Sequence, residues 1–472
     1  MKTIIVNVIR EEVRAAIKEG EELMALELER PCREHLVGNI YKGVVQNVLP
    51  GMQAAFVDIG RSKNAYLYIG DGKKDAGRRG TSIHVGQVLP VQITKEEIGT
   101  KGPRATLHLA IPGRSVVLLP SSAYIGTSHK IQDEQERKRL FAIARSACPE
   151  GMGVILRTAA AGLEEDAIKK DIGSLADLWQ SVARRLKNAK NTALVYRDTD
   201  IVLRIVRDFF DEQVEVMVID NEDVYSRVVE MLREWRPCWA EKVMLYRGGD
   251  IFAEYGIEKA ANSLNDRKVQ LKSGGFLVID KTEAMTVIDV NTGSFVGNLN
   301  LGETAFALNI EAAREVMRQL RLRDIGGIVL VDFIDMEKPA YNEALLQQMR
   351  QLAGQDPTKV NVVDITSLGL VEITRKKSRH NLETLQHADC PVCHGTGKIP
   401  SDEAMAVKIC RDIRRIEAKG HAAGGYELHL CPKDMREINT LGHLDRLQKE
   451  LGIDIKMIAD AEMMPGCYSL LR

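Results

Sequence analysis

The stretch GGFLVIDKTEAMTVIDVNTGSF, residues 274–295, decides the fold of the central part of this chain. Two apolar runs, FLVID and TVIDV, flank a polar segment, which predicts a hairpin of two buried strands. Apolar residues then recur at helical spacing over residues 304–324 until a glycine pair ends the pattern. A further buried strand is predicted in IVLVDFIDM (328–336), followed by a helix near 341–353 and a strand at 359–366. Strands that alternate with helices indicate an α/β layer fold.

Polar side chains interrupt or end these buried strands. Asp289 and Asn291 are two residues apart in TVIDVN, so a strand places both on one face, and Asp332 ends the apolar run IVLVD. A carboxylate in such a run is costly unless it is paired or binds a metal. Two carboxylates and an amide suit Mg²⁺ and predict metal-assisted phosphodiester hydrolysis. Alternatively, each aspartate only caps the turn after its strand. A turn would add Asp335 to the site, and Asp280 is a weaker candidate.

The flanking regions have other patterns. Residues 2–29 predict two strands around a polar hairpin or a short helix. Short strands with glycine at the turns over about 38–112 predict a small barrel. Residues 113–200 mix strands with a long amphipathic helix, and residues 200–264 again have an α/β pattern. A small α/β tail is predicted at 401–472.

The composition limits the class of protein. A chain of 472 residues is too long for one core and predicts about three or four domains. Lys and Arg (65) balance Asp and Glu (66), so a nucleic acid would have to bind local patches. No apolar window approaches the length of a membrane span, and the N-terminal apolar run is too short for a secretory signal. The cysteines are mostly scattered, which argues against a disulfide framework and predicts the cytoplasm.

Aromatic and basic residues of the predicted barrel are typical of a surface that binds single strands. Phe56 and Tyr66 offer faces on which bases stack, and basic residues nearby would neutralise phosphates. These basic residues are Lys42, Arg61, Lys63 and Lys101. The alternative is that Phe56 belongs to the barrel core.

A candidate anion pocket lies in VILRTAAAG, where Arg157 and Thr158 separate a strand from a helix. Arg supplies a planar fork of donors, Thr a hydroxyl, and the helix its free N–H groups. The alternative is an ordinary exposed arginine. The runs TRKKSRH (374–380) and RQLRLRD (318–324) place further positive charge on either side of the aspartates, although such runs usually form a solvated face.

HADCPVCHGTGKIP, residues 387–400, contains half of a thiolate zinc site, Cys390 and Cys393. His387 and His394 are nearby, but none of the other cysteines forms a second Cys-x-x-Cys pair. Two copies of the chain across a two-fold axis would supply four thiolates. A redox pair is the alternative, although no thioredoxin-like strand precedes the motif.

Five motifs together resemble the ribonuclease E/G family of endoribonucleases, in order and over almost the whole chain. They are NIYKGVV…AAFVDIG, GMGVILRTA, TVIDVN, RQLRLRDIGGIVLVDFIDM and CPVCHGTG. The resemblance implies an α/β multidomain (α+β) fold with a split RNase H-like domain, an inserted OB-fold (S1-type) RNA-binding barrel and a 5′-sensor domain. A DNase I-like catalytic domain, a zinc-link and a small C-terminal α/β domain follow. The implied ranges are 1–35 with 204–264, then 36–112, 113–203, 265–386, 387–400 and 401–472.

The resemblance also implies roles for the candidate residues. Asp289 and Asp332 would hold the catalytic Mg²⁺, and Asn291 would orient the attacking water or the scissile phosphate. Cys390 and Cys393 would form a zinc-link between protomers, with about one structural Zn²⁺ per two chains.

A pocket for a 5′-monophosphate is implied as well. Arg157 and Thr158 would bind the phosphate, with Gly113 and Val117 at the wall of the pocket. The residues that match RNA contacts of the barrel are Phe56, Tyr66 and Lys101.

The resemblance therefore implies a Mg²⁺-dependent endoribonuclease, similar to the short, ribonuclease G type of the family. It would cut single-stranded A/U-rich RNA, leave 5′-phosphate and 3′-hydroxyl ends, and respond to a 5′-monophosphate. Ribosomal RNA processing and messenger RNA decay are the implied roles, with a homodimer or a dimer of dimers as the assembly. Two alternatives stay open, a non-catalytic RNA-binding or ribosome-assembly factor with a structural zinc, and a phosphatase for a small substrate.

Overall fold

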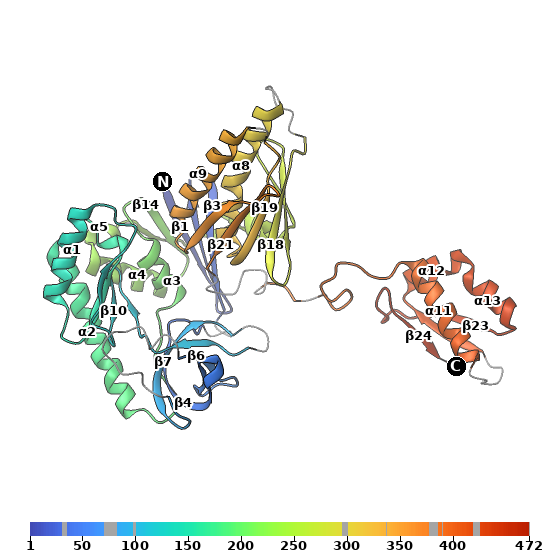
Figure 1. The fold of residues 1–472 in the computed structure, drawn as a ribbon, viewed down its shortest axis with the longest axis horizontal. Helices are drawn as coiled ribbons and strands as arrows, with labels where there is room; N and C mark the ends of the chain where they lie inside the picture. Colours follow the sequence, from blue (N-terminus) through green and yellow to red (C-terminus); the bar gives the residue numbers. More distant parts are fainter. Residues whose placement is uncertain are drawn as a thin grey trace. The chain divides into compact units, whose positions relative to one another are not determined.

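A computed structural model describes most of the chain, as two compact units, Met1–Leu385 and Gln386–Arg472 (Figure 1). The described residues are 1–30, 35–69, 83–97, 101–294, 301–336, 338–376, 386–388, 390–418 and 425–471. No helix in these ranges is long and apolar enough to cross a membrane.

The hairpin, helices and strands predicted around residues 274–366 are confirmed. The strands belong to one mixed sheet of six described strands. Its strands, in spatial order, are β16 (Lys268–Gln270), β17 (Phe276–Lys281), β18 (Met285–Asn291), β19 (Gly327–Asp332), β21 (Leu370–Arg375) and β20 (Val360–Ile365). The helices α8 (Leu301–Leu322) and α9 (Pro339–Gln355) cover one face of this sheet, as Figure 1 shows. In β18 the buried side chains alternate with more exposed ones, so the second face stays open.

A second sheet combines two segments that are far apart in the sequence. Its order is β15 (Val243–Leu245), β14 (Val214–Ile219), β1 (Lys2–Val8), β2 (Val13–Glu19) and β3 (Glu22–Glu29), and β14 runs parallel to β1. The helices α3 (Ile201–Phe209) and α4 (Glu222–Trp235) bury apolar side chains in the same core. The predicted hairpin or short helix between the first strands is wrong, because residues 13–19 form β2. Pairing with β1 and β3 on both sides overrides the weak strand propensity of Ala15 and Ala16.

The predicted barrel is confirmed. Its strands are β4 (Ile40–Leu49), β5 (Ala54–Asp58), β6 (Ala65–Tyr68), β8 (Arg104–Thr106) and β7 (Val88–Lys95), and β7 pairs back onto β4 to close the ring. Numbered along the sequence, the five described strands of the ring have the spatial order 1-2-3-5-4. This order is consistent with an OB-fold. Most of the loop 71–86, rich in glycine and basic residues, lies outside the described residues.

The segment after the barrel forms a small sheet packed against two helices. The strands are β11 (Ile125–Thr127), β12 (Gly153–Leu156), β10 (Val116–Leu119) and β9 (Ile111–Pro112), in that order. The long helix predicted there is α2 (Glu165–Asn188), and α1 (Glu134–Ala147) joins it.

The tail is the small α/β structure that its sequence predicts. The strands β23 (Ile455–Ala459), β22 (Tyr426–Leu430) and β24 (Tyr468–Leu471) form its sheet. The helices α11 (Asp402–Glu417), α12 (Pro432–Leu441) and α13 (His443–Leu451) share one core with it.

Candidate active site and RNA-binding surfaces

Two carboxylates lie side by side on the open face of the central sheet. The strands β18 and β19 run parallel, and Asp289 is the register partner of Asp332. Both side chains are exposed. Asn291 lies on the same face of β18, and its Nδ2 donates a hydrogen bond of 2.8 Å to Oδ2 of Asp289. The convergence predicted from the sequence is therefore present.

No described lysine or arginine forms an ion pair with Asp289 or Asp332. Asp280, on the neighbouring strand and the same face, is different, because Arg267 binds it through two hydrogen bonds of 2.5 and 2.6 Å. This contact with Arg267 lowers the pKa of Asp280. Asp280 thus has its counter-charge already, whereas the Asp289–Asp332 pair has none among the described residues.

The pair fits a divalent cation that keeps several water ligands. In the described part of the chain, no three acidic, His or Cys side chains gather closely enough to hold a metal by themselves, so Asp335 does not complete such a group. Among the described residues, neither carboxylate accepts a hydrogen bond from the turn after its strand, which argues against a mere capping role. Two carboxylates beside open coordination positions are typical of Mg²⁺ sites that bind phosphate.

A buried amide fixes the chain just beyond Asp332. Asn309 of α8 is fully buried. Its Nδ2 donates to the carbonyl of Ile334 (2.7 Å), and its Oδ1 accepts from the N–H of Ile334 (3.1 Å). None of the sequence motifs indicated Asn309, although an asparagine on the apolar face of a helix is a recognisable signal.

The four residues predicted for the anion pocket lie at the same end of the small sheet. Arg157 follows β12, and its Nη1 donates to the carbonyl of Gly113 (2.8 Å). The hydroxyl of Thr158 lies 3.1 Å from that of Ser128. Val117 of β10 pairs with β12 two residues before Arg157. A Cβ at Gly113 would lie 2.8 Å from the side chain of Leu175 and 2.9 Å from that of Asp171, so a larger residue would force these side chains to shift.

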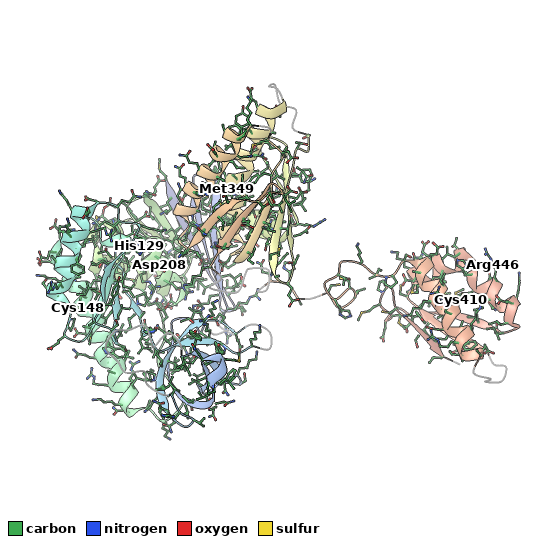
Figure 2. All side chains as sticks on the ribbon, in the orientation of Figure 1. His129, Cys148, Asp208, Met349, Cys410 and Arg446 are labelled. Carbon is green, nitrogen blue, oxygen red and sulfur yellow. The ribbon has the colours of Figure 1, made fainter. Side chains whose placement is uncertain are left out.

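Arg157 has a further partner that the sequence did not indicate. Its Nη2 donates a hydrogen bond of 2.7 Å to Asp208, which lies near the end of α3 and is labelled in Figure 2. Arg207 also contacts Asp208 (3.2 Å) and lies 3.4 Å from Asp198. Burial alone would raise the pKa of Asp208, but the hydrogen bonds and charges of Arg207 and Arg157 outweigh this effect and lower it. Two arginines and two aspartates thus form a cluster without net charge.

A row of aromatic and basic side chains crosses the barrel. Phe56 pairs with Tyr66, with ring centroids 6.0 Å apart in an edge-on arrangement. Phe56 is absent from the barrel core, so the core alternative is wrong. Tyr66 is the register partner of Arg104, and Arg104 pairs with Lys95. Arg104 was not among the predicted residues, because only the pairing of β6 with β8 places it beside the rings.

The other predicted cations of the barrel differ in their surroundings. Lys101 is exposed, shortly before β8. Lys42 donates to the carbonyl of Ala189 (2.7 Å), and Lys63 lies 3.6 Å from Glu97. Lys42 and Lys63 are therefore engaged within the protein. Arg61 also has a partner.

The arginine-rich runs near the aspartates have structural contacts. Arg375 is buried between Asp356 (3.1 Å) and Asp324 (2.6 Å). Arg318 binds Glu315 and donates to the carbonyl of Leu23. The interpretation of these runs as a solvated face is wrong for both arginines, and residues 377–380 lie outside the described residues.

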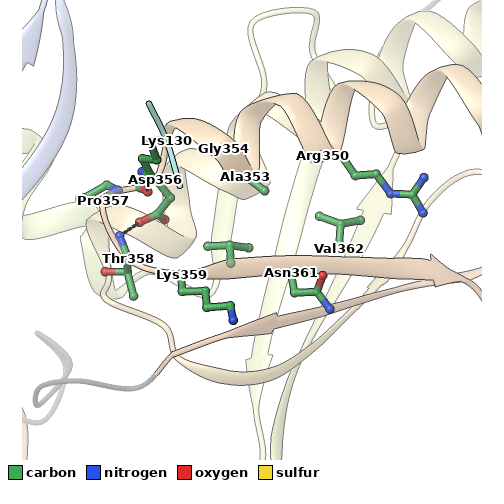
Figure 3. Close-up of a pocket in the computed structure, with 11 residues that line it drawn as sticks. Lys130, Arg350, Ala353, Gly354, Asp356, Pro357, Thr358, Lys359, Asn361 and Val362 are labelled. Atoms are coloured by element: carbon green, nitrogen blue, oxygen red, sulfur yellow. Dashed lines mark hydrogen bonds between the residues drawn. The ribbon is translucent and has the colours of Figure 1, made fainter. Parts of the chain in front are cut away.

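A cavity of about 470 Å³ lies beside the edge strand β20 (Figure 3). Lys130, Arg350 and Lys359 line it, and Asp356 is the one acidic residue in its described lining. Because Asp356 is bound by Arg375, positive charge dominates. Lys130 comes from the segment of the anion pocket and donates to the carbonyl of Asp356 (3.0 Å), so the two segments meet here. No pattern in the sequence indicated this cavity.

Cys390 and Cys393 lie on one tight turn in the second unit. The N–H of His394 donates to the carbonyl of Cys390 (2.8 Å), and that of Thr396 to the carbonyl of Cys393 (2.9 Å). Hydrogen bonds from the backbone N–H groups of Cys393 and Val392 lower the pKa of the Cys390 thiol. The described residues supply no third His, Cys, Asp or Glu ligand close to these two thiols.

Comparisons with known proteins agree with the arrangement of motifs. The sequence model of the ribonuclease E/G family matches residues 110–378. Ribonuclease G of Haemophilus influenzae is 40% identical over 427 residues, which cover 88% of this chain and 87% of that protein. Ribonuclease G of Escherichia coli K12 is 39% identical over the same shares. Ribonuclease E of Escherichia coli K12 is 33% identical over 91% of this chain and 42% of its own length. The chain belongs to the ribonuclease E/G family, as its motifs predicted.

Proposed function

We propose that this endoribonuclease cuts single-stranded RNA at the Asp289–Asp332 pair, with Mg²⁺ as its cofactor. The observation that carries the proposal is the pair itself, two register-matched carboxylates on an open sheet face without a cationic partner among the described residues. Uncompensated carboxylates of this kind attract a divalent cation and, through it, a phosphate.

Each residue of the site has a chemical role in this proposal. Asp289 and Asp332 would hold the Mg²⁺, which when bound stabilises charge on the phosphoryl oxygens and makes a water more acidic. Asn291, bound to Asp289, would hold the attacking water or the scissile phosphate in line. Asn309 keeps the chain after Asp332 in place. Attack by water on phosphorus with departure of the 3′ oxygen leaves a 5′-phosphate and a 3′-hydroxyl.

The barrel would bind the RNA through stacking and charge. Phe56 and Tyr66 offer ring surfaces, and Lys101 and Arg104 offer positive charge beside them. Stacking tolerates every base, and A/U-rich RNA is favoured because it stays single-stranded most readily. The basic cavity at Lys130 and its neighbours would add a phosphate contact between the two segments that meet there.

The 5′-monophosphate would bind at Arg157 and Thr158, with Gly113 and Val117 at the wall. What supports this assignment is the common location of the four residues and the donor fork of Arg157. The bound phosphate would anchor the 5′ end of the RNA and so raise the effective concentration of the RNA strand at the two carboxylates.

Two chains would share a Zn²⁺ through Cys390 and Cys393, giving a homodimer or a dimer of dimers. The lowered pKa of the Cys390 thiol and the absence of a third ligand among the described residues support this. We expect about one Zn²⁺ per two chains, and we expect Cys390→Ser to lose both the metal and the dimer in light scattering and metal analysis. One Zn²⁺ in a monomeric chain would contradict the shared site.

The domain names and ranges given above, from the split RNase H-like domain to the C-terminal domain, remain a proposal. Ribosomal RNA precursors and messenger RNA are the proposed substrates, in the cytoplasm.

The deciding experiment uses one short 5′-monophosphorylated RNA with Mg²⁺, with EDTA, and with Mg²⁺ restored. We expect cleavage, loss and recovery, with 5′-phosphate products. Binding without cleavage under all conditions would favour the RNA-binding or ribosome-assembly factor instead. A phosphatase for a small substrate would show no salt-dependent binding of single-stranded RNA.

A further inference from the structure

The guanidinium of Arg157 is held at two corners. Its Nη1 donates to the carbonyl of Gly113 (2.8 Å), and its Nη2 donates to Oδ1 of Asp208 (2.7 Å). Gly113 lies beside β9, whereas Asp208 lies on α3, so two separate segments fix the plane of one side chain. A guanidinium has further N–H groups, which stay available to an anion.

Asp208 is itself held firmly. Arg207 donates to it from Nε and from Nη2, both at 3.2 Å. The side chain of Arg207 is 8% exposed, and its Nη1 also donates to the carbonyl of Pro112 (3.4 Å). Asp208 therefore cannot follow Arg157 if that side chain turns away, and it acts as a fixed acceptor.

We infer that Asp208 is the positioning residue of the 5′-phosphate pocket, acting by fixing the guanidinium of Arg157. The inference rests on the proposed sensor and deepens it. A long arginine side chain loses conformational freedom when it binds, and a side chain that is already held has less to lose. The acceptor oxygen of Asp208 thus improves the binding of the RNA end without touching it.

The test compares one RNA sequence with a 5′-monophosphate and with a 5′-hydroxyl, by the ratio of kcat/KM values and by the separate constants. We expect Asp208→Ala to raise KM for the phosphorylated RNA and to lower the ratio, with kcat little changed. Asp208→Asn retains the acceptor oxygen for Arg157 but loses the second oxygen, which accepts from Arg207, so its KM should rise less than that of Asp208→Ala. Asp211→Ala is the matched control, since Asp211 binds Lys2 at 2.5 Å and should keep the wild-type ratio.

A double mutant separates this role from general structural damage. If Asp208 acts through Arg157, Asp208→Ala lowers the ratio no further in an Arg157→Ala background. Equal losses for both RNAs, or equal behaviour of the Ala and Asn variants, would overturn the inference. If Asp208→Ala does not fold, Asp208→Glu can replace it, because this variant keeps a charge beside Arg207 but moves the acceptor oxygen away from Arg157. A wild-type ratio of kcat/KM values in Asp208→Glu would overturn the inference.

The outcomes also distinguish this inference from the proposed sensor. A wild-type ratio in Arg157→Ala would remove the sensor and the inference together. A low ratio in Arg157→Ala with a wild-type ratio in Asp208→Ala would leave the sensor intact and remove only the role of Asp208.

Discussion

The central sheet and the anion pocket differ in whether their charged side chains have a partner of opposite charge. On the sheet, Asp289 and Asp332 adjoin each other without a cation among the described residues. In the pocket, Arg157 is already bound by Asp208, which Arg207 holds in turn. In the proposed function, the first site would need a bound cation before a phosphate could approach the two carboxylates. The second would bind a phosphate through an arginine whose side chain Asp208 already holds in place.

The largest expected effect is on kcat, and it comes from removing one of the two carboxylates that have no cationic partner among the described residues. Asp289→Asn or Asp332→Asn should lower kcat by more than about 100-fold, since losing even an outer partner of a metal ligand costs roughly 10- to 100-fold. RNA binding, measured by fluorescence anisotropy without divalent metal, should persist.

Asp280→Asn is the matched control for these variants. Asp280 lies on the same sheet face, but Arg267 neutralises it, so its loss should leave kcat near the wild-type value. Equal losses in all three variants would show that the face is only structurally sensitive and would contradict the assignment of the site.

The carboxylate site was predictable because its signal is local. An aspartate within Ile-Val-Leu-Val runs against the pattern of its own strand, and register then places Asp332 beside Asp289. The pairing between Arg157 and Asp208 was not predictable. These residues are 51 positions apart, on a strand end and a helix, and nothing in either segment specifies the other.

The same distinction holds for the fold. The sheet over 274–366 follows from strong apolar periodicity, whereas β2 (Val13–Glu19) was missed because its buried centre contains two alanines. Alanine carries little strand propensity, and β2 exists because β1 and β3 bind both of its edges. Tertiary pairing of this kind leaves no signature within the segment.

The second prediction concerns Arg157, whose positive charge is already paired with Asp208. Arg157→Ala should lower the preference for 5′-monophosphate over 5′-hydroxyl RNA by about tenfold or more, because hydrogen bonds to charged groups contribute roughly 1.5 to 3 kcal/mol. Matched kinetics on the two RNAs measure this ratio. Thr158→Val should have a smaller effect in the same direction, since it removes a neutral hydroxyl. An unchanged ratio in both variants would place the sensing of the 5′ end elsewhere.

The smallest effect is expected on the barrel, where Arg104 has neither a metal nor a fixed carboxylate partner in the described structure. It lies beside Tyr66 and opposite Lys95, so it extends the aromatic row with positive charge. Arg104→Ala should weaken single-stranded RNA binding by roughly a few-fold and reduce the salt slope of log K by about 1 if it contacts one phosphate. Arg104→Lys should restore that slope, because a point charge is sufficient there. If the affinity falls but the slope does not change, Arg104 supports Tyr66 by packing, and the barrel binds RNA through its rings alone.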